Sequence, residues 1–115
     1  MRILKFKGRF GYLKNELHEG IILFCQFEPF DDEKILDKIA NKFRLNKENK
    51  LILVPFAHLY EKSASKENSE KLFKLFSKKC MNLNKEIVII PFGIKKEFYL
   101  YAYDDNSTIK FMSFK

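Results

Sequence analysis

The chain has 115 residues, of which 46% are hydrophobic and 13 are phenylalanine. This size supports one domain with a substantial core and excludes a disordered tail or a two-domain enzyme. The net charge of +7 favours a polyanionic partner such as RNA, DNA or an acidic membrane surface, but a solvated lysine face explains the same charge without a partner. Arginine is scarce (Arg2, Arg9, Arg44), which argues against base reading in a major groove, where bidentate arginine is the usual contact.

The cysteines and the N-terminus bear on the cellular compartment. Cys25 and Cys80 lie far apart among apolar neighbours, without metal-ligand spacing, and predict buried thiols in a reducing environment. The N-terminus carries charges at Arg2, Lys5 and Lys7 with no long apolar run after them, so it is not a signal peptide, and no segment reaches transmembrane length. The sequence also contains no Gly-rich phosphate loop and no nucleophile elbow. We therefore expect a cytoplasmic protein with no membrane partner, metal or cofactor.

The N-terminal segment predicts two short strands. Weak alternation over residues 1–6 indicates the first strand, and Gly8 and Gly11 bracket a turn. Phe10 and Tyr12 then lie on the second strand.

A strong strand follows over residues 21–28, after a turn at residues 18–20. Both faces of this strand are apolar, so both are expected to be covered. Pro29 ends the strand, and the carboxylates at residues 31–33 favour a helix start. Apolar residues at helical spacing give this helix one buried stripe: Ile35, Leu36, Ile39, Ala40 and Phe43.

The second half of the chain begins with a strand, a helix and a strand. Residues 51–56 predict a buried strand, and residues 72–80 carry the apolar stripe of a second helix. Residues 86–92 predict another buried strand.

The C-terminal part predicts a hairpin. Residues 97–103 alternate as a strand, and a hairpin-type turn at residues 104–107 joins them to a terminal strand over residues 109–114. Helices then link the middle strands, while hairpins close both ends. The sequence therefore predicts one domain over residues 1–115 with an α+β fold, a mixed, barrel-like β-sheet with two helices packed on it.

The same dipeptide ends two of the predicted strands. Pro55-Phe56-Ala57-His58-Leu59 follows the first of them, and Pro91-Phe92-Gly93-Ile94-Lys95-Lys96 follows the second. Proline cannot donate to a sheet ladder, so pairing stops at each motif. Two strands that stop in the same way would place His58 and Lys96 at one edge of one sheet, which is the predicted site.

Taken singly, the candidate residues have plain structural explanations. A lone histidine such as His58 is more often a hydrogen-bonded structural residue than a catalyst. Lys96 lies among charged residues and has the pattern of a solvated lysine. Tyr99, Tyr101 and Tyr103 stack on bases in one interpretation, and form a half-buried sheet face or an oligomer interface in another.

Taken together, the two motifs resemble the N-terminal editing domain of archaeal threonyl-tRNA synthetase. The resemblance is specific from Leu51 to Phe98, where both motifs and their separation match the family without a gap. The family's fold is similar to that of D-aminoacyl-tRNA deacylases. Because the family hydrolyses seryl-tRNA mischarged on threonine tRNA, the resemblance implies a tRNA editing function.

The resemblance also implies roles for residues of this chain. Lys96 falls on the family's functional lysine, which positions substrate and water and stabilises developing negative charge, and His58 falls on its pocket histidine. These two are the predicted catalytic residues. The family relies on the terminal 2′-hydroxyl of the tRNA, so no catalytic triad is required. The predicted substrate-binding residues are Phe27, Phe56, Ala57, Phe92, Gly93 and Lys95.

The sequence departs from the family's pattern at several places, which include a shorter loop between the early strands. Lys95 stands where the family usually has an aromatic residue, and Phe27 stands where it has a small aliphatic residue on a pocket strand. Residues 109–113 contain no glutamate, although the family has one in the matching region.

We therefore expect an aminoacyl-tRNA deacylase, either a free-standing protein or an excised synthetase domain. Its expected partners are the aminoacylated 3′ end of tRNA, a second copy of the chain in a homodimer, and a threonyl-tRNA synthetase catalytic protein. The alternatives are a non-catalytic tRNA- or synthetase-binding module of the same fold, a D-aminoacyl-tRNA deacylase, and a generic basic nucleic-acid binder.

Overall fold

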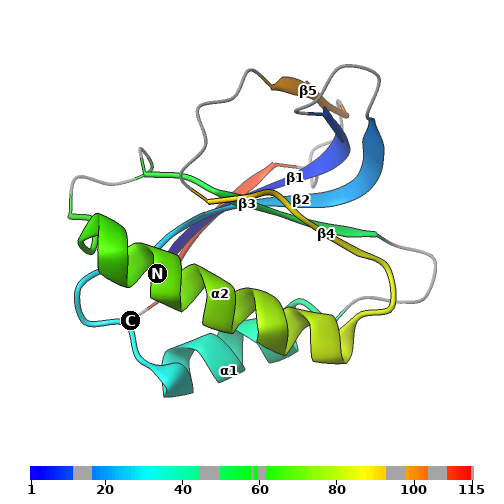
Figure 1. Cartoon of the computed structure of the whole chain (residues 1–115). Coiled ribbons are helices and arrows are strands. Elements are labelled where there is room, and N and C mark those ends of the chain that lie inside the picture. Colours follow the sequence, from blue (N-terminus) through cyan, green and yellow to red (C-terminus); the bar gives the residue numbers. More distant parts are fainter. Residues whose placement is uncertain are drawn as a thin grey trace.

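Two helices cover one face of a six-stranded mixed sheet in the computed structural model of the chain (Figure 1). The structure describes residues 1–11, 17–44, 50–57, 59, 62–92, 98–103 and 109–114. The elements in chain order are β1 (Arg2–Gly11), β2 (His18–Gln26), α1 (Glu33–Lys42), β3 (Leu51–Pro55), α2 (Lys66–Leu83), β4 (Ile87–Ile89), β5 (Tyr99–Ala102) and β6 (Lys110–Ser113). The strand order is β4-β3-β2-β1-β5, with β6 also paired to β1, which confirms a mixed α+β fold with two helices.

The sheet is open, so the prediction of a barrel-like sheet is wrong. β4 and β5 end the strand order on opposite sides, and no pairing within the described residues joins them. β4 has only 3 residues. Pro91 follows it closely and cannot donate a ladder hydrogen bond. So short a strand offers too few backbone groups to close the sheet.

β1 is one continuous strand, which corrects two predicted turns. The sequence predicted one turn between Gly8 and Gly11 and another at residues 18–20. Instead β1 pairs antiparallel with β2 along nearly its whole length, and Gly8 lies directly opposite Gly20. The predicted strand residue Tyr12 lies outside the described residues.

The two paired glycines permit close backbone approach. A Cβ on Gly8 would lie 1.9 Å from the carbonyl oxygen of Tyr101, and a Cβ on Gly20 would lie 2.1 Å from the carbonyl oxygen of Lys50. Any larger residue would therefore push a neighbouring segment away. Glycine within a strand often marks such a contact, and here it has that meaning instead of marking a turn.

β2, β3 and β4 run parallel, and the two helices connect them. One sheet face and both helices form the larger core, whose members from β2 and β3 are Ile21, Leu23, Cys25, Leu51 and Leu53. The opposite face carries a second, smaller core made of Phe10, Ile22, Phe24, Ile52, Val54 and Ile90. The apolar parts of β2 and β3 are thus buried on both faces, as their apolar runs predicted, while β4 is half-buried.

Side-chain caps begin both helices. Asp32 accepts a hydrogen bond of 3.0 Å from a first-turn N–H of α1, which confirms the predicted helix start. Ser65 caps α2 in the same way, at 3.1 Å. Lys79 of α2 then joins the two helices by ion pairs with Glu33 at 3.1 Å and Asp37 at 2.6 Å. Neither helix in the described chain combines the length and apolar character needed to span a membrane.

β5 and β6 do not form the predicted hairpin. β5 pairs antiparallel with residues 8–11 of β1, and β6 pairs antiparallel with residues 2–5 of the same strand. The two short strands therefore run in the same direction, end to end along one side of β1. The turn predicted at residues 104–107 lies outside the described residues.

Both cysteines are free and buried, as predicted. Burial among apolar groups raises the pKa of the Cys25 thiol well above its usual value. Burial also raises the pKa of Cys80, to about 12. Both thiols therefore stay protonated near neutral pH, and neither is a nucleophile there.

The N-terminal ammonium group lies buried among charged partners. Met1 N donates to Asp31 Oδ1 at 2.7 Å, to Glu28 Oε1 at 3.0 Å and to the Phe114 carbonyl at 3.0 Å. Arg2 Nε donates to the same Glu28 oxygen at 3.0 Å. The side chain of Glu28 is only 2% exposed and that of Asp31 is 0% exposed. These contacts join the start of β1, the connection between β2 and α1, and the residue after β6.

We predict that Asp31→Asn destabilises the fold strongly. Asp31 binds the Met1 ammonium with one oxygen and the Glu28 N–H, at 2.7 Å, with the other. Removing its charge weakens a buried ion pair, which typically costs about 3–5 kcal/mol, and Glu28 offsets part of this cost. The free energy of unfolding from urea titration should therefore fall by about 3 kcal/mol.

Asp37→Asn is the matched control, because Asp37 pairs with Lys79 while its side chain is 56% exposed. An exposed pair contributes at most about 1 kcal/mol. Equal losses in the two variants would contradict the stabilising role of the buried cluster.

Candidate functional site

The two Pro-Phe motifs leave the sheet at the same edge, as the sequence predicted. β3 and β4 are parallel neighbours, with Leu53 opposite Ile89. Pro55 and Pro91 therefore lie at corresponding ends of the two strands. The predicted site residues His58, Gly93, Lys95 and Lys96 lie outside the described residues.

The two motif phenylalanines point to opposite faces of the sheet. The ring of Phe56 lies 5.2 Å from the ring of Phe24, in the smaller core on the face away from the helices. The ring of Phe92 lies 6.2 Å from that of Phe73 in α2, on the helix face. The same dipeptide therefore leads to different side-chain surroundings in the two motifs.

Phe24 of β2 brings the two motif segments together. Its ring lies 5.2 Å from Phe56 and 5.8 Å from Phe98, and Phe98 also stacks on Phe10 at 5.5 Å. Phe6 contacts Phe24 from a further side at 5.5 Å. Phe56 precedes His58 by two residues and Phe98 follows Lys96 by two. Phe56 of the first motif and Phe98 after the second motif therefore pack in the same aromatic cluster. We define this aromatic cluster as Phe6, Phe10, Phe24, Phe56 and Phe98.

Gln26 holds the backbone next to His58. Its side chain is buried at the end of β2, with 1% of the residue exposed, and Oε1 accepts a hydrogen bond from the Leu59 N–H at 2.7 Å. Gln26 was not predicted from the sequence. The signal was present, because a glutamine that follows Ile22 and Phe24 at a spacing of two lies on the same apolar face and requires a partner there.

Successive residues at the end of β2 contact described points of the connection from β3 to α2. The Cys25 carbonyl accepts from the Phe56 N–H at 2.9 Å, and the Phe27 carbonyl accepts from the Ala64 N–H at 2.8 Å. Together with the Gln26 contact, these bonds fix three points of the segment that contains His58. β2 and the residue after it therefore anchor Phe56, Leu59 and Ala64.

The other predicted binding residues lie apart from Phe56. Phe27 is only 2% exposed, and its ring packs 6.2 Å from Phe73 and 6.3 Å from Phe76 on the helix face. Ala57 is exposed. Phe27 therefore fills the core beneath α2, and Phe24 and Gln26 occupy the face of β2 that Phe56 shares.

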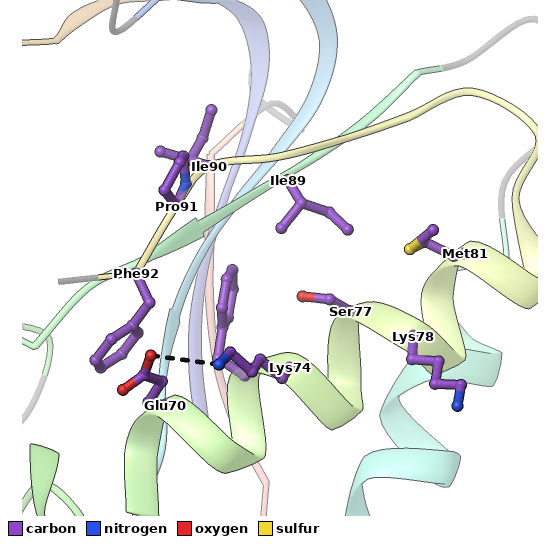
Figure 2. A pocket seen from close by; sticks show the side chains of 10 residues that line it. Glu70, Lys74, Ser77, Lys78, Met81, Ile89, Ile90, Pro91 and Phe92 are labelled. Atoms are coloured by element: carbon purple, nitrogen blue, oxygen red, sulfur yellow. Dashed lines mark ion pairs between the residues drawn. The ribbon is translucent and has the colours of Figure 1, made fainter. Parts of the chain in front are cut away.

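A pocket of about 450 Å³ lies between α2 and the end of β4 (Figure 2). Pro91 and Phe92 of the second motif line it, together with apolar residues of both elements. At its rim Lys74 forms an ion pair with Glu70 at 3.5 Å. The Ser77 hydroxyl in its wall is buried and has no hydrogen-bond partner among the described residues. The pocket shares Phe92 with the predicted site, but Phe56, Ala57 and Phe27 do not line it.

Comparison with known proteins places these features in a family. Residues 6–107 match the model of the archaea-specific editing domain of threonyl-tRNA synthetase. The chain is 33% identical over 104 residues to a threonine–tRNA ligase of Staphylothermus marinus, in a match that covers 79% of this chain and 16% of the ligase. The chain therefore spans only a small part of that relative's length.

A solved structure shares the fold at low sequence identity. The c-Myc DNA Unwinding Element Binding Protein superposes with a TM-score of 0.74 over 97% of each chain, at 13% identity. This similarity concerns the fold alone. The family match covers most of the chain and includes both Pro-Phe motifs. The chain belongs to the family of archaea-specific editing domains of threonyl-tRNA synthetase.

Proposed function

We propose that this domain, whose fold is D-aminoacyl-tRNA deacylase-like, hydrolyses seryl-tRNA mischarged on threonine tRNA. The observation that carries the proposal is the convergence of the two motifs on Phe24, which lies within 6 Å of both Phe56 and Phe98. The segments that contain His58 and Lys96 therefore begin or end on one aromatic cluster, on the sheet face that the helices leave open.

The chemistry explains why a separate hydrolytic site is needed. Serine and threonine differ by one methyl group, and a pocket distinguishes such pairs by only about 1–3 kcal/mol. A synthetic site for threonine therefore also accepts serine at a low rate. A second site that hydrolyses the ester of the smaller amino acid removes the error.

In the proposed reaction, water attacks the carbonyl carbon of the seryl ester. The bond between that carbon and the ribose oxygen breaks, so the products are free serine and tRNA with its terminal hydroxyl restored. Lys96 positions the substrate and water and stabilises the negative charge that develops on the carbonyl oxygen. The proposal assigns His58 to the aminoacyl-binding site, where main-chain groups around Ala57, Phe92 and Gly93 hold the amino acid.

The same proposal includes the setting of the reaction. We propose a cytoplasmic homodimer that binds the 3′ end of tRNA and works with a threonyl-tRNA synthetase, as a free-standing protein or as a domain of one. Exposed aromatic rings on the open sheet face support the dimer, because Phe98 is 47% and Phe111 49% exposed. Sedimentation equilibrium distinguishes the dimer from a monomer.

The first prediction concerns Lys96. The purified chain should release serine from seryl-tRNA(Thr) faster than the uncatalysed reaction, and Lys96→Ala should abolish this release because the developing charge loses its stabilisation. Release is measured with radiolabelled serine at high enzyme concentration. Lys85→Ala, which removes an exposed lysine two residues past the C-terminal end of α2, is the control and should keep full activity.

Other outcomes of this assay would support one of the alternative functions. A rate equal to that without protein, despite tRNA binding, would mean a non-catalytic binding module. Cleavage of D-aminoacyl esters only, in a panel with L-serine, L-threonine and several D-amino acids, would mean a D-aminoacyl-tRNA deacylase. Either result would overturn the proposed substrate.

The second prediction concerns Gln26. Gln26→Met keeps the side-chain length but leaves the Leu59 N–H without its acceptor, so the segment containing His58 loses a fixed point. A displacement of about 1 Å near a reacting group costs on the order of 10²-fold in rate, and kcat should fall by about 10- to 100-fold with little change in KM. Gln26→Glu, which retains an acceptor oxygen, should recover part of the rate. Unchanged kcat in a folded Gln26→Met protein would contradict this positioning role.

A further inference from the structure

A group of tyrosine and cationic side chains forms a surface at the end of the sheet that the helices do not cover. β5 lies at this end, away from α1 and α2 (Figure 1). Ile3 of β1 faces the helices, and alternation along the strand places the next residues of that side, Lys5, Lys7 and Arg9, beyond them. This surface is distinct from the aromatic cluster, which lies on the other face of the sheet.

Strand pairing brings three tyrosines beside these cations. Tyr101 lies directly opposite Arg9, and Tyr99 lies opposite the end of β1. The Tyr103 N–H donates to the Lys7 carbonyl at 2.9 Å. On β6, Lys110 lies opposite Lys5. We call this set the tyrosine surface, and its members are Lys5, Lys7, Arg9, Tyr99, Tyr101, Tyr103 and Lys110.

Two of the three rings are more than half exposed. Tyr99 is 53% and Tyr101 51% exposed. The Arg9 guanidinium lies 5.3 Å from the ring centre of Tyr101 and 6.0 Å from that of Tyr103, and the two rings contact edge to face. Glu19 pairs with Arg9 at 3.6 Å and accepts a hydrogen bond from the Tyr103 hydroxyl. These contacts hold Tyr101 and Tyr103 in place, so aromatic faces are presented without a large loss of freedom on binding.

We propose that the tyrosine surface binds a single-stranded segment of RNA. Bases stack on Tyr99 and Tyr101, since every base presents a π-face, and phosphates contact Lys5, Lys7 and Lys110. The proposal rests on the proposed function only in taking tRNA as the source of that segment. In this proposal the tyrosine surface binds an unpaired segment of the tRNA, and the aromatic cluster lies near the aminoacyl end.

Charge favours RNA over a second copy of the chain as the occupant. The described part of the surface carries Lys5, Lys7, Arg9 and Lys110 against the single carboxylate of Glu19. A two-fold contact between copies would oppose like charges, whereas a polyanion complements them. The other sheet face, where Phe98 and Phe111 are exposed, is uncharged at those positions and suits a protein contact better.

The test measures binding by fluorescence anisotropy, without hydrolysis. The probes are a labelled single-stranded octanucleotide RNA, uncharged tRNA and a DNA duplex. Tyr99→Ala and Tyr101→Ala should each weaken binding of the octanucleotide by about tenfold, and binding of tRNA should weaken in the same direction, because each change removes one stacked base. Binding of the DNA duplex should be weaker and should not change in the tyrosine variants, since the bases of a duplex are already stacked.

The lysines are tested by the salt dependence of binding. Lys5→Gln with Lys7→Gln should lower the slope of log affinity against log salt by about 0.7 for each phosphate that the lysines no longer neutralise.

The control is Lys71→Gln with Lys78→Gln on α2, which removes the same charge from exposed lysines elsewhere. It should change RNA affinity by less than about twofold if binding is local to the tyrosine surface. Equal losses in the control, or wild-type affinity in both tyrosine variants, would overturn the proposal. So would loss of self-association in the tyrosine variants with RNA binding intact. The octanucleotide carries no aminoacyl ester, so its binding is measured independently of hydrolysis, and failure of the hydrolysis proposal and failure of this one are read out separately.

Discussion

The end of β2 is the point on which the rest of the structure depends. β2 pairs antiparallel with β1 and parallel with β3, so its last residues lie at the edge where β3 and β4 also stop. Cys25, Gln26 and Phe27 hold three points of the connection from β3 to α2. Glu28, two residues past the strand, binds the N-terminal ammonium group. The end of β2 thus contacts the start of β1 through Glu28 and the connection after β3 through Cys25, Gln26 and Phe27, and the Met1 ammonium extends these contacts to the residue after β6.

The sequence predicted those elements whose causes are local. The apolar runs of β3 and β4, the apolar stripe of α1 and the capping carboxylate of Asp32 each depend on neighbours within a few residues, and each was confirmed. Gly8 was misread because its cause is distant. Closely spaced glycines predict a turn from local sequence alone. Gly8 is instead required because the Tyr101 carbonyl, which is distant in sequence, lies against it. The hairpin failed for the same reason, since β1 competes for both of its strands.

The sequence predicted where the two motifs leave the sheet, but not how their phenylalanines pack. Proline chemistry located the edge of the sheet, because a missing N–H has the same effect in any context. Local sequence did not reveal that Phe56 and Phe92 turn to opposite faces, since that depends on the neighbouring rings of Phe24 and Phe73. Phe27 lies on the same face as Cys25, in the core beneath the helices, as the alternation along β2 indicates. Gln26 lies on the other face, where it accepts the hydrogen bond from the Leu59 N–H.

The collinear arrangement of β5 and β6 has a consequence for how such domains diversify. Each short strand is fixed by its own stretch of β1, from Gly8 for one and from Lys5 for the other. The register of one therefore does not depend on the length of chain that leads to the other. Insertions and deletions between them leave the sheet unchanged, because loop length costs little free energy. Related lineages can lengthen or shorten this connection independently of the scaffold, next to a surface of tyrosines and lysines.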